Sequence, residues 1–149
     1  MPFIVRWPEL VQAGGHSEQL VSLTDIFATV CEIVGYELDP NEGEDSFSFL
    51  PVLKGVAAAQ SLRLNMIHHS MDGMFSIRQG KWKLILGRGS GGFSNPRRIQ
   101  PAPGEPPGQL YDLEEDLAET QNLWSQHPEI VKRLTSLLDE YEQEGRSRS

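Results

Sequence analysis

Apolar side chains recur at helical spacing in two separate stretches of the chain. The stretch 22–35 reads SLTDIFATVCEIVG, with Asp25 in its first turn, Cys31 in its apolar face and Gly35 at its end. Further along, Pro128 precedes an apolar stripe with the spacing i, i+3/i+4, i+7. The stripe consists of Ile130, Val131, Leu134, Leu137, Leu138 and Tyr141. Both stretches are predicted to be amphipathic helices, in which Cys31 is a packed thiol rather than a nucleophile.

Between these helices the pattern changes to short runs that are typical of β-strands. The predicted strands are LNMIHHS (64–70), FSIR (75–78), WKLIL (82–86) and QLYDL (109–113), with Gln79-Gly80 as a tight hairpin loop. PFIVRWP (2–8) also predicts a short strand, and FSFLPVLKG (47–55) predicts a helical turn that stops at Gly55. The stretch Gly87–Gly108 is too rich in Gly and Pro for regular structure, which predicts a long loop. The fold class expected from these elements is α+β.

Charge is distributed unevenly along this chain of 149 residues, whose net charge is −8. Nine acidic and two basic side chains lie in residues 1–62, whereas residues 63–98 carry seven basic side chains and one acid, Asp72. An acidic protein with one basic segment indicates a local anion site rather than nucleic-acid binding. The alternative is a set of solvated Lys and Arg side chains on a sheet. No apolar run approaches the roughly 20 residues that a membrane-spanning helix needs.

The group His68-His69-Ser70 contains the most reactive side chains of the chain. On a strand, His68 and His69 point to opposite faces, so only one of them can face a given site. A Ser beside a His does not make a catalytic triad, because triad members converge from separated positions. The alternative is one packed and one exposed histidine. The four histidines are not at metal-ligand spacings, and no metal site is predicted.

Arginines and glycines concentrate in the long loop. GRGSGG (87–92) is not a phosphate-binding loop, because no Lys-Ser/Thr and no helix follow it. Its glycines, Gly91 among them, would still let backbone amides approach an anion, with Arg88, Arg97 and Arg98 nearby. The alternative is an ordinary surface loop. The residues alone therefore predict a cationic hairpin and loop without a complete active site.

The order of these segments resembles the C-terminal third of a type I sulfatase, an arylsulfatase-like member of the alkaline phosphatase superfamily. The resemblance runs from Pro2 to about Tyr141 and is carried by six segments in order: PFIVRWP, LVSLTDIFATVCEIVG, DSFSFLPVLKG, HHSMDGMFSIRQGKWKLIL, GSGG and QLYDLEEDLAETQNL. The GxWKL and LYDLxxDxxExxNL patterns are the most specific. Leu117 stands where a Pro is common in the family.

The resemblance implies a division of the chain and of the chemistry. Residues 1–62 would be the end of the large α/β domain, 63–145 the C-terminal subdomain, a small antiparallel sheet with a packed C-terminal helix, and 146–149 a tail. Complete enzymes hydrolyse sulfate esters with a calcium ion and a formylglycine made within CxPxR or SxPxR. This chain contains neither motif, so no cofactor is assigned to it, and Met1 would correspond to an internal methionine of a longer enzyme. Complete family members are commonly periplasmic or extracellular.

The leading hypothesis is therefore a C-terminal sulfatase fragment that supports the fold and the rim of the substrate cleft and is inactive alone. Its partners would be a sulfated carbohydrate or aryl sulfate and the N-terminal sulfatase domain. The candidate substrate-binding residues are His68, His69, Arg88, Gly91, Arg97 and Arg98, and none is predicted to be catalytic. Two alternatives remain open, a non-enzymatic module that binds sulfated glycans and a fragment of a related phosphoesterase.

Overall fold

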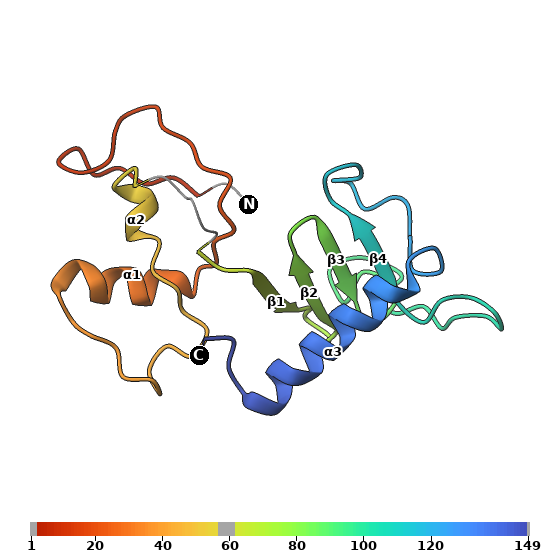
Figure 1. The fold of residues 1–149 in the computed structure, drawn as a ribbon. Coiled ribbons are helices and arrows are strands. Elements are labelled where there is room, and N and C mark those ends of the chain that lie inside the picture. Colours follow the sequence, from red (N-terminus) through yellow and green to blue (C-terminus); the bar gives the residue numbers. More distant parts are fainter. Residues whose placement is uncertain (1–2, 57–61, 149) are drawn as a thin grey trace. The chain divides into compact units, whose positions relative to one another are not determined.

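The chain forms two compact units in a computed structural model that describes residues 3–56 and 62–148. The first unit comprises Met1–Leu64 with Gly145–Ser149, and the second, which we call the sheet unit, comprises Asn65–Glu144. Figure 1 shows the elements of both units along the chain. Each unit is described by itself.

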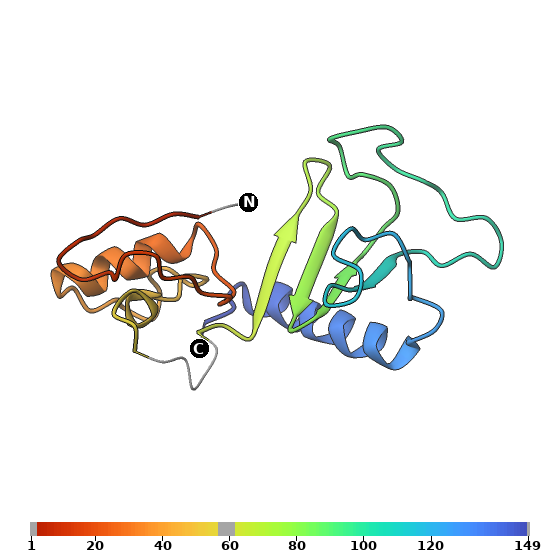
Figure 2. The ribbon, with the colours of Figure 1, turned by 90° about the horizontal axis from the view of Figure 1, so that it is seen from above.

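The sheet unit is a four-stranded antiparallel sheet with the strand order β1-β2-β3-β4. Its strands are β1 (Asn65–His69), β2 (Phe75–Gln79), β3 (Trp82–Ile85) and β4 (Gln109–Asp112), and helix α3 (Pro128–Glu144) follows them. The helix lies across one face of the sheet, as Figures 1 and 2 show. The predicted fold class is confirmed, and so is the predicted start of the last helix at Pro128.

The hairpin between β2 and β3 differs from its prediction by one residue. Gln79 pairs with Trp82, so the loop consists of Gly80 and Lys81 rather than Gln79 and Gly80. Gly80 has a φ of 56°, a value that a residue without Cβ adopts at little cost. The turn therefore places its glycine at the first loop position, and Gln79 stays in the strand.

The core of the sheet unit lies between the sheet and α3. Alternate strand residues meet the helix stripe, because side chains alternate between the faces of a strand. The core residues have no exposed surface and are Ile77, Leu84, Leu110, Leu134 and Leu138. Trp82 and Tyr141 pack against this cluster as partly buried side chains. The apolar stripe predicted for the last helix is thus the helix face that packs on the sheet.

Antiparallel pairing brings two connections to the same end of the sheet. His69 at the end of β1 pairs with Phe75 at the start of β2, and Ile85 at the end of β3 pairs with Gln109 at the start of β4. The turn 70–74 and the loop 86–108 therefore leave the sheet at one end, as Figure 2 shows. We call this the loop end of the sheet.

The first unit contains two helices, α1 (Asp25–Val34) and α2 (Leu50–Leu53). Gly35 caps α1, with its N–H directed to the carbonyls of Cys31 and Glu32. The strand predicted over 2–8 is wrong for its described part, since residues 3–7 are irregular. An extended segment becomes a strand only when it pairs with another, and the Trp7 carbonyl instead accepts the N–H groups of Leu10 and Val11 in a turn.

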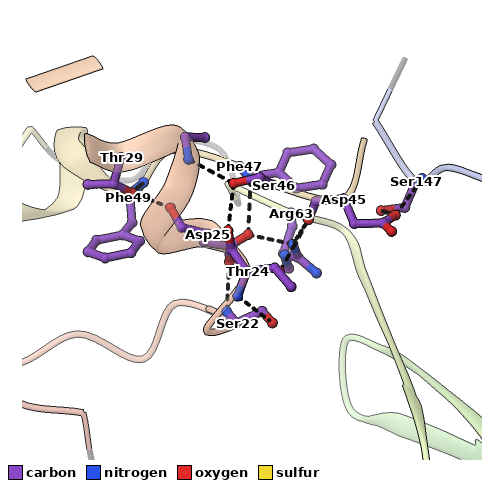
Figure 3. A network of polar contacts seen from close by, with 11 residues as sticks. Ser22, Thr24, Asp25, Thr29, Asp45, Ser46, Phe47, Phe49, Arg63 and Ser147 are labelled. Carbon is purple, nitrogen blue, oxygen red and sulfur yellow. Dashed lines mark hydrogen bonds and ion pairs between the residues drawn. The ribbon is translucent and has the colours of Figure 1, made fainter. Parts of the chain in front are cut away.

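Polar contacts converge on Asp25 at the start of α1, as Figure 3 shows. Its carboxylate accepts the Ser22 N–H at 2.7 Å and the Phe47 N–H at 3.0 Å, and it pairs with Arg63 at 2.6 Å. Asp25 and Arg63 are only 2% and 5% exposed. Arg63 also donates to the Asp45 carbonyl. The role expected of Asp25 as a helix-start group is confirmed, and the ion pair adds a link to a residue far along the chain.

Further hydrogen bonds connect α1 to the segment 46–49. The Ser46 hydroxyl donates to the Thr24 carbonyl and accepts the Ala28 N–H, while Thr29 accepts the Phe49 N–H. Buried polar groups are costly without partners, and these are satisfied by one another. The network fixes the course of the chain after α1.

Residues 145–148, which include most of the tail expected at 146–149, are hydrogen-bonded to the loop 39–45 of the same unit. Arg148 donates to the Glu42 carbonyl at 2.6 Å, and Ser147 donates to Asp45 at 2.7 Å. Arg146 likewise donates to the Pro40 carbonyl, so hydrogen bonds to the loop backbone hold a segment that has no apolar residue. Within residues 3–56 and 62–148, no helix has both the length and the apolar character to cross a membrane.

Candidate functional site

The loop end of the sheet brings together the turn 70–74 and the loop 86–98. The Asp72 N–H donates to the Gly91 carbonyl at 2.9 Å, and the Gly91 N–H donates to the Arg97 carbonyl at 2.9 Å. The Ser70 hydroxyl accepts the Met74 N–H and shapes the turn. These backbone contacts join segments that are distant in sequence into one structure, which we call the loop platform (residues 70–74 and 86–98).

Gly91 lies at the closest contact within the loop platform. It is buried, and a Cβ at this position would lie 2.4 Å from the Ser70 Cβ. The N–H groups of Ser90, Gly91 and Gly92 all donate to acceptors within the loop. These amides are therefore engaged by the loop itself, whereas the sequence suggested that they could approach an anion. Gly91 allows the close packing that holds the arginines in place.

Two of the predicted arginines converge on Asp72 of the turn. Arg97 forms an ion pair with the Asp72 carboxylate at 3.0 Å, and its side chain is 51% exposed. Arg98 donates to the Asp72 carbonyl. Because both guanidinium groups have additional donors, each can bind a further anion while it keeps its contact with Asp72. Asp72, the single acid of the basic segment, thus orients two cations.

Arg88 and Arg98 line a cavity of about 440 Å³. Its other walls include Phe75 and Leu86 from the sheet end and Ile99 from the returning loop. The Ile99 N–H donates to the Arg88 carbonyl at 3.0 Å, which closes the loop across the cavity. The result is an apolar recess with two cations at its edge.

Glu105 balances the charge of Arg88. The two side chains form an ion pair, and Glu105 also accepts the Ala102 N–H. The Ala102 N–H and the Arg88 guanidinium hold the pKa of Glu105 below its usual value. Glu105 is 47% exposed, so an anion from solvent can compete with it for Arg88.

The two histidines point to opposite faces of β1, as predicted. His69 shares the face of Ile67 and packs edge-on against Phe75 with 6.0 Å between ring centroids. Its Nδ1 lies 3.0 Å from the Ser70 carbonyl. A carbonyl only accepts, so Nδ1 is the protonated nitrogen and Nε2 is the remaining acceptor. His69 therefore neighbours the cavity through Phe75, while the exposed His68 lies on the other face.

The cations of the β2–β3 hairpin lie at the other end of the sheet. Lys81 pairs with Asp112 at 2.6 Å, Lys83 pairs with Glu119 at 2.6 Å, and the Arg78 Nε donates to the Gly80 carbonyl. They stabilise the turn and the segment after β4. The basic segment of the sequence is thus split in space, and only its later arginines belong to the loop platform.

Sequence reasoning missed the residues that organise the loop platform. Asp72 and Glu105 are the counterions of its arginines, and Phe75 joins His69 to the cavity. Asp72 was visible as the only acid in a basic stretch. Glu105 and Phe75 gave no such signal, because loop closure and strand pairing decide what they contact.

A metal centre does not fit the described residues. Across residues 3–56 and 62–148, no three His, Cys, Asp or Glu side chains come close enough together to hold a metal ion. Cys31 is a buried free thiol on α1. Calcium and formylglycine chemistry is therefore not assigned to any residue of this chain.

Solved structures of the same fold identify the class of protein. One of them, in complex with its substrate D-glucosamine-2-N,6-O-disulfate, superposes with a TM-score of 0.67 at 24% identity and covers 94% of this chain and 27% of its own. Another, concerned with the metabolism of multiple glycosaminoglycans by Bacteroides thetaiotaomicron, gives a TM-score of 0.63 at 27% identity, with 80% and 24% covered. The fold is the sheet-and-helix subdomain of the alkaline-phosphatase-like architecture.

Curated relatives identify the family. An N-acetylgalactosamine-6-O-sulfatase of Bacteroides thetaiotaomicron is 31% identical over 139 residues, and an ulvan-active sulfatase of Formosa agariphila is 28% identical over 145 residues. The matches cover 93% and 84% of this chain. No protein-family model matches the chain. The chain belongs to the sulfatase family and corresponds to the C-terminal portion of these relatives.

The chain spans only about a quarter of the length of these relatives, with 26% and 29% of the two proteins covered. The resemblance seen in the ordered sequence motifs is thereby confirmed. The alternative of a separate glycan-binding module is not favoured.

Proposed function

We propose that this chain forms the C-terminal subdomain of a sulfatase that acts on a sulfated carbohydrate, and that its loop platform forms part of the rim of the substrate cleft. The observation that carries the proposal is the convergence of Arg88, Arg97 and Arg98 on the loop end of the sheet. Guanidinium groups bind sulfate through paired, charge-assisted hydrogen bonds. The named activity of the N-acetylgalactosamine-6-O-sulfatase relative supports a sulfated sugar as the substrate class.

Within this rim, each predicted residue has its own task. Arg97 and Arg98 would hold the sulfate or an acidic group of a neighbouring sugar, because both lie at the platform edge. Arg88 would bind an anion in exchange for Glu105. His69 would offer Nε2 to a sugar hydroxyl, which can donate a hydrogen bond. Gly91 supports the platform, and His68 lies on the opposite strand face.

The chemical step is assigned to the rest of a complete enzyme. Among the described residues, no three His, Cys, Asp or Glu side chains gather to hold a metal ion, and the single cysteine, Cys31, is buried. We therefore expect the isolated chain to show no turnover of an aryl sulfate ester with or without calcium. Calcium-dependent turnover by the pure chain would overturn this assignment.

The apolar side of α1 supports a docking role for the first unit. On one side of α1, Phe27, Val30 and Val34 are 49%, 49% and 70% exposed, and Leu23, just before the helix, is 60% exposed. We assign residues 1–62 to the end of the large α/β domain and expect this helix face to pack against the N-terminal part of a sulfatase. Buried there, it would resemble an ordinary helix face in a core.

The experiment is a titration of ¹⁵N-labelled chain with N-acetylgalactosamine 6-O-sulfate, followed by NMR. Shifts in the platform amides and the Arg88, Arg97 and Arg98 side chains, with a Kd on the order of 1 mM or weaker, support a cleft rim. N-acetylgalactosamine without sulfate is the matched control and should shift these signals much less. Equal shifts with both sugars would refute anion recognition, and micromolar binding would favour an autonomous binding module.

A further inference from the structure

Phe93 stands out on the loop platform because it is 87% exposed. It is the most exposed aromatic side chain in the described part of the chain. A single exposed apolar residue is ordinary on a protein surface, so its exposure alone indicates nothing. The hydrogen bonds and side chains around Phe93 indicate its role.

The segment that carries Phe93 is held in shape by its own hydrogen bonds. The Ser90 hydroxyl donates to the Ser94 carbonyl and accepts the Ser94 N–H at 3.1 Å, so it closes the turn around Phe93. The Ser90 N–H donates to the Pro96 carbonyl at 3.1 Å. The backbone therefore presents the ring to solvent in a defined position, which reduces the entropy lost when a ligand binds.

An apolar and a cationic side chain flank the same turn. A Cβ added at Gly92 would lie 3.0 Å from the Met71 Cβ and 3.4 Å from the Arg97 Nη2. Met71 is 62% exposed and Arg97 is 51% exposed. Met71 and Arg97 therefore lie beside Gly92, the residue that precedes Phe93. An exposed aromatic ring, an exposed apolar side chain and an exposed cation thus border one turn, a combination that would suit the apolar face and the charged substituent of a sulfated pyranose.

We propose that Phe93 is a sugar-stacking residue, with Met71 extending the apolar surface and Arg97 binding the sulfate or carboxylate of the same or an adjacent sugar. The C–H face of a pyranose ring is apolar and packs on an aromatic face, while the charged substituent projects to the side. The inference rests on the proposed function and deepens it, because it names a residue that recognises the sugar ring rather than its sulfate.

The test compares the NMR affinities of the chain and its variants for N-acetylgalactosamine 6-O-sulfate. Phe93→Ala is expected to weaken binding about tenfold, and Phe93→Leu nearly as much, whereas Phe93→Trp retains it. Arg97→Ala should weaken the binding of the sulfated sugar and leave the weaker binding of the unsulfated sugar unchanged. Thermal unfolding of each variant checks the fold, which an exposed residue should not affect.

The outcomes separate the two proposals. If the wild-type chain binds and Phe93→Ala binds equally well, the stacking role is wrong and the cleft-rim function stands. If Phe93→Ala weakens sulfated and unsulfated sugars alike while the wild type does not distinguish them, stacking stands and sulfate recognition fails. No binding by the wild type overturns both.

Discussion

The two units of this chain bury different kinds of side chain. The sheet unit has a core of five aliphatic residues without exposed surface, built from three strands and α3. The first unit buries the polar side chains of Asp25, Thr29, Ser46 and Arg63 beside the apolar Ala28, Cys31, Phe49 and Leu50, and leaves much of the apolar side of α1 in solvent. Hydrophobic burial therefore stabilises the sheet unit, whereas a polar network determines the local structure of the first.

This difference accords with the roles proposed for the two units. The sheet unit has a closed aliphatic core and can support the loop platform, whereas the first unit leaves an apolar helix face uncovered, as the proposed docking role requires. Four experiments test the comparison.

Removing the buried carboxylate should have the largest effect. Asp25→Ala leaves Arg63 without its buried counterion and the Ser22 and Phe47 amides without their acceptor, which should cost about 3–5 kcal/mol. Hydrogen exchange read by mass spectrometry should show faster exchange in α1 and unchanged exchange in β1–β4. Glu37→Ala, at an exposed position just after α1, is the control. Equal acceleration in both units would refute their independence.

A cavity in the aliphatic core should produce the reverse pattern. Leu84→Ala removes a side chain with no exposed surface, and such changes cost about 2–5 kcal/mol. Exchange should accelerate in the strands and α3 but not in α1. Leu117→Ala, at a residue that is 80% exposed, should leave denaturant unfolding unchanged. Unaltered exchange in the sheet after Leu84→Ala would contradict the proposed core.

Charges on α1 should change association more than folding. The exposed apolar face should drive self-association of the isolated chain, and the double variant Val30→Glu, Val34→Lys should reduce it. Light scattering at increasing concentration measures the effect, and circular dichroism checks helix content. Glu32→Lys, also exposed on α1 but outside the apolar side, is the control. A monomeric wild-type chain would count against a docking surface.

The smallest effect should be that of pH on the surface ion pairs of the sheet unit. The hydrogen bond that the Lys81 ammonium donates to the Asp112 carboxylate lowers the pKa of Asp112 from its usual 3.8, and the same bond raises the pKa of Lys81 above its usual 10.5. The contribution of Asp112 is present above pH 3.8 and is lost as the pH falls through its lowered pKa. The contribution of Lys81 is present below pH 10.5 and is lost as the pH rises through its raised pKa.

Denaturant midpoints measured against pH provide the test. Asp112→Asn should flatten the acid limb of the curve modestly, because the Lys81 side chain of this pair is 38% exposed and solvent screens the interaction. Glu105→Gln should also flatten it, since the pKa of Glu105 is lowered from 4.5. An acid limb that is identical in both variants and the wild type would show that these pairs do not contribute.

Local patterns were sufficient to predict most elements. The stripe from Ile130 to Tyr141, the glycine after α1 and the alternating runs of β1–β4 each depend on neighbours in sequence, and each element was found. The prediction of a strand at residues 2–8 was wrong for the residues that the structure describes, because a strand requires a pairing partner and no local pattern provides one. The hairpin loop lies one residue later than predicted, because pairing between the strands determines their register.

Residue types and their spacing were enough to predict the family, the fold class and the concentration of basic side chains in residues 63–98. Ordered motifs carry this information, since it depends only on residue type and spacing. The tertiary structure decided which cations share a site. Strand pairing places Arg88, Arg97 and Arg98 at one end of the sheet and Lys81 and Lys83 at the other. The folded loops then bring Glu105 to Arg88 and Asp72 to Arg97 as counterions. Such selection depends on contacts between residues far apart in the chain, which only the folded backbone establishes.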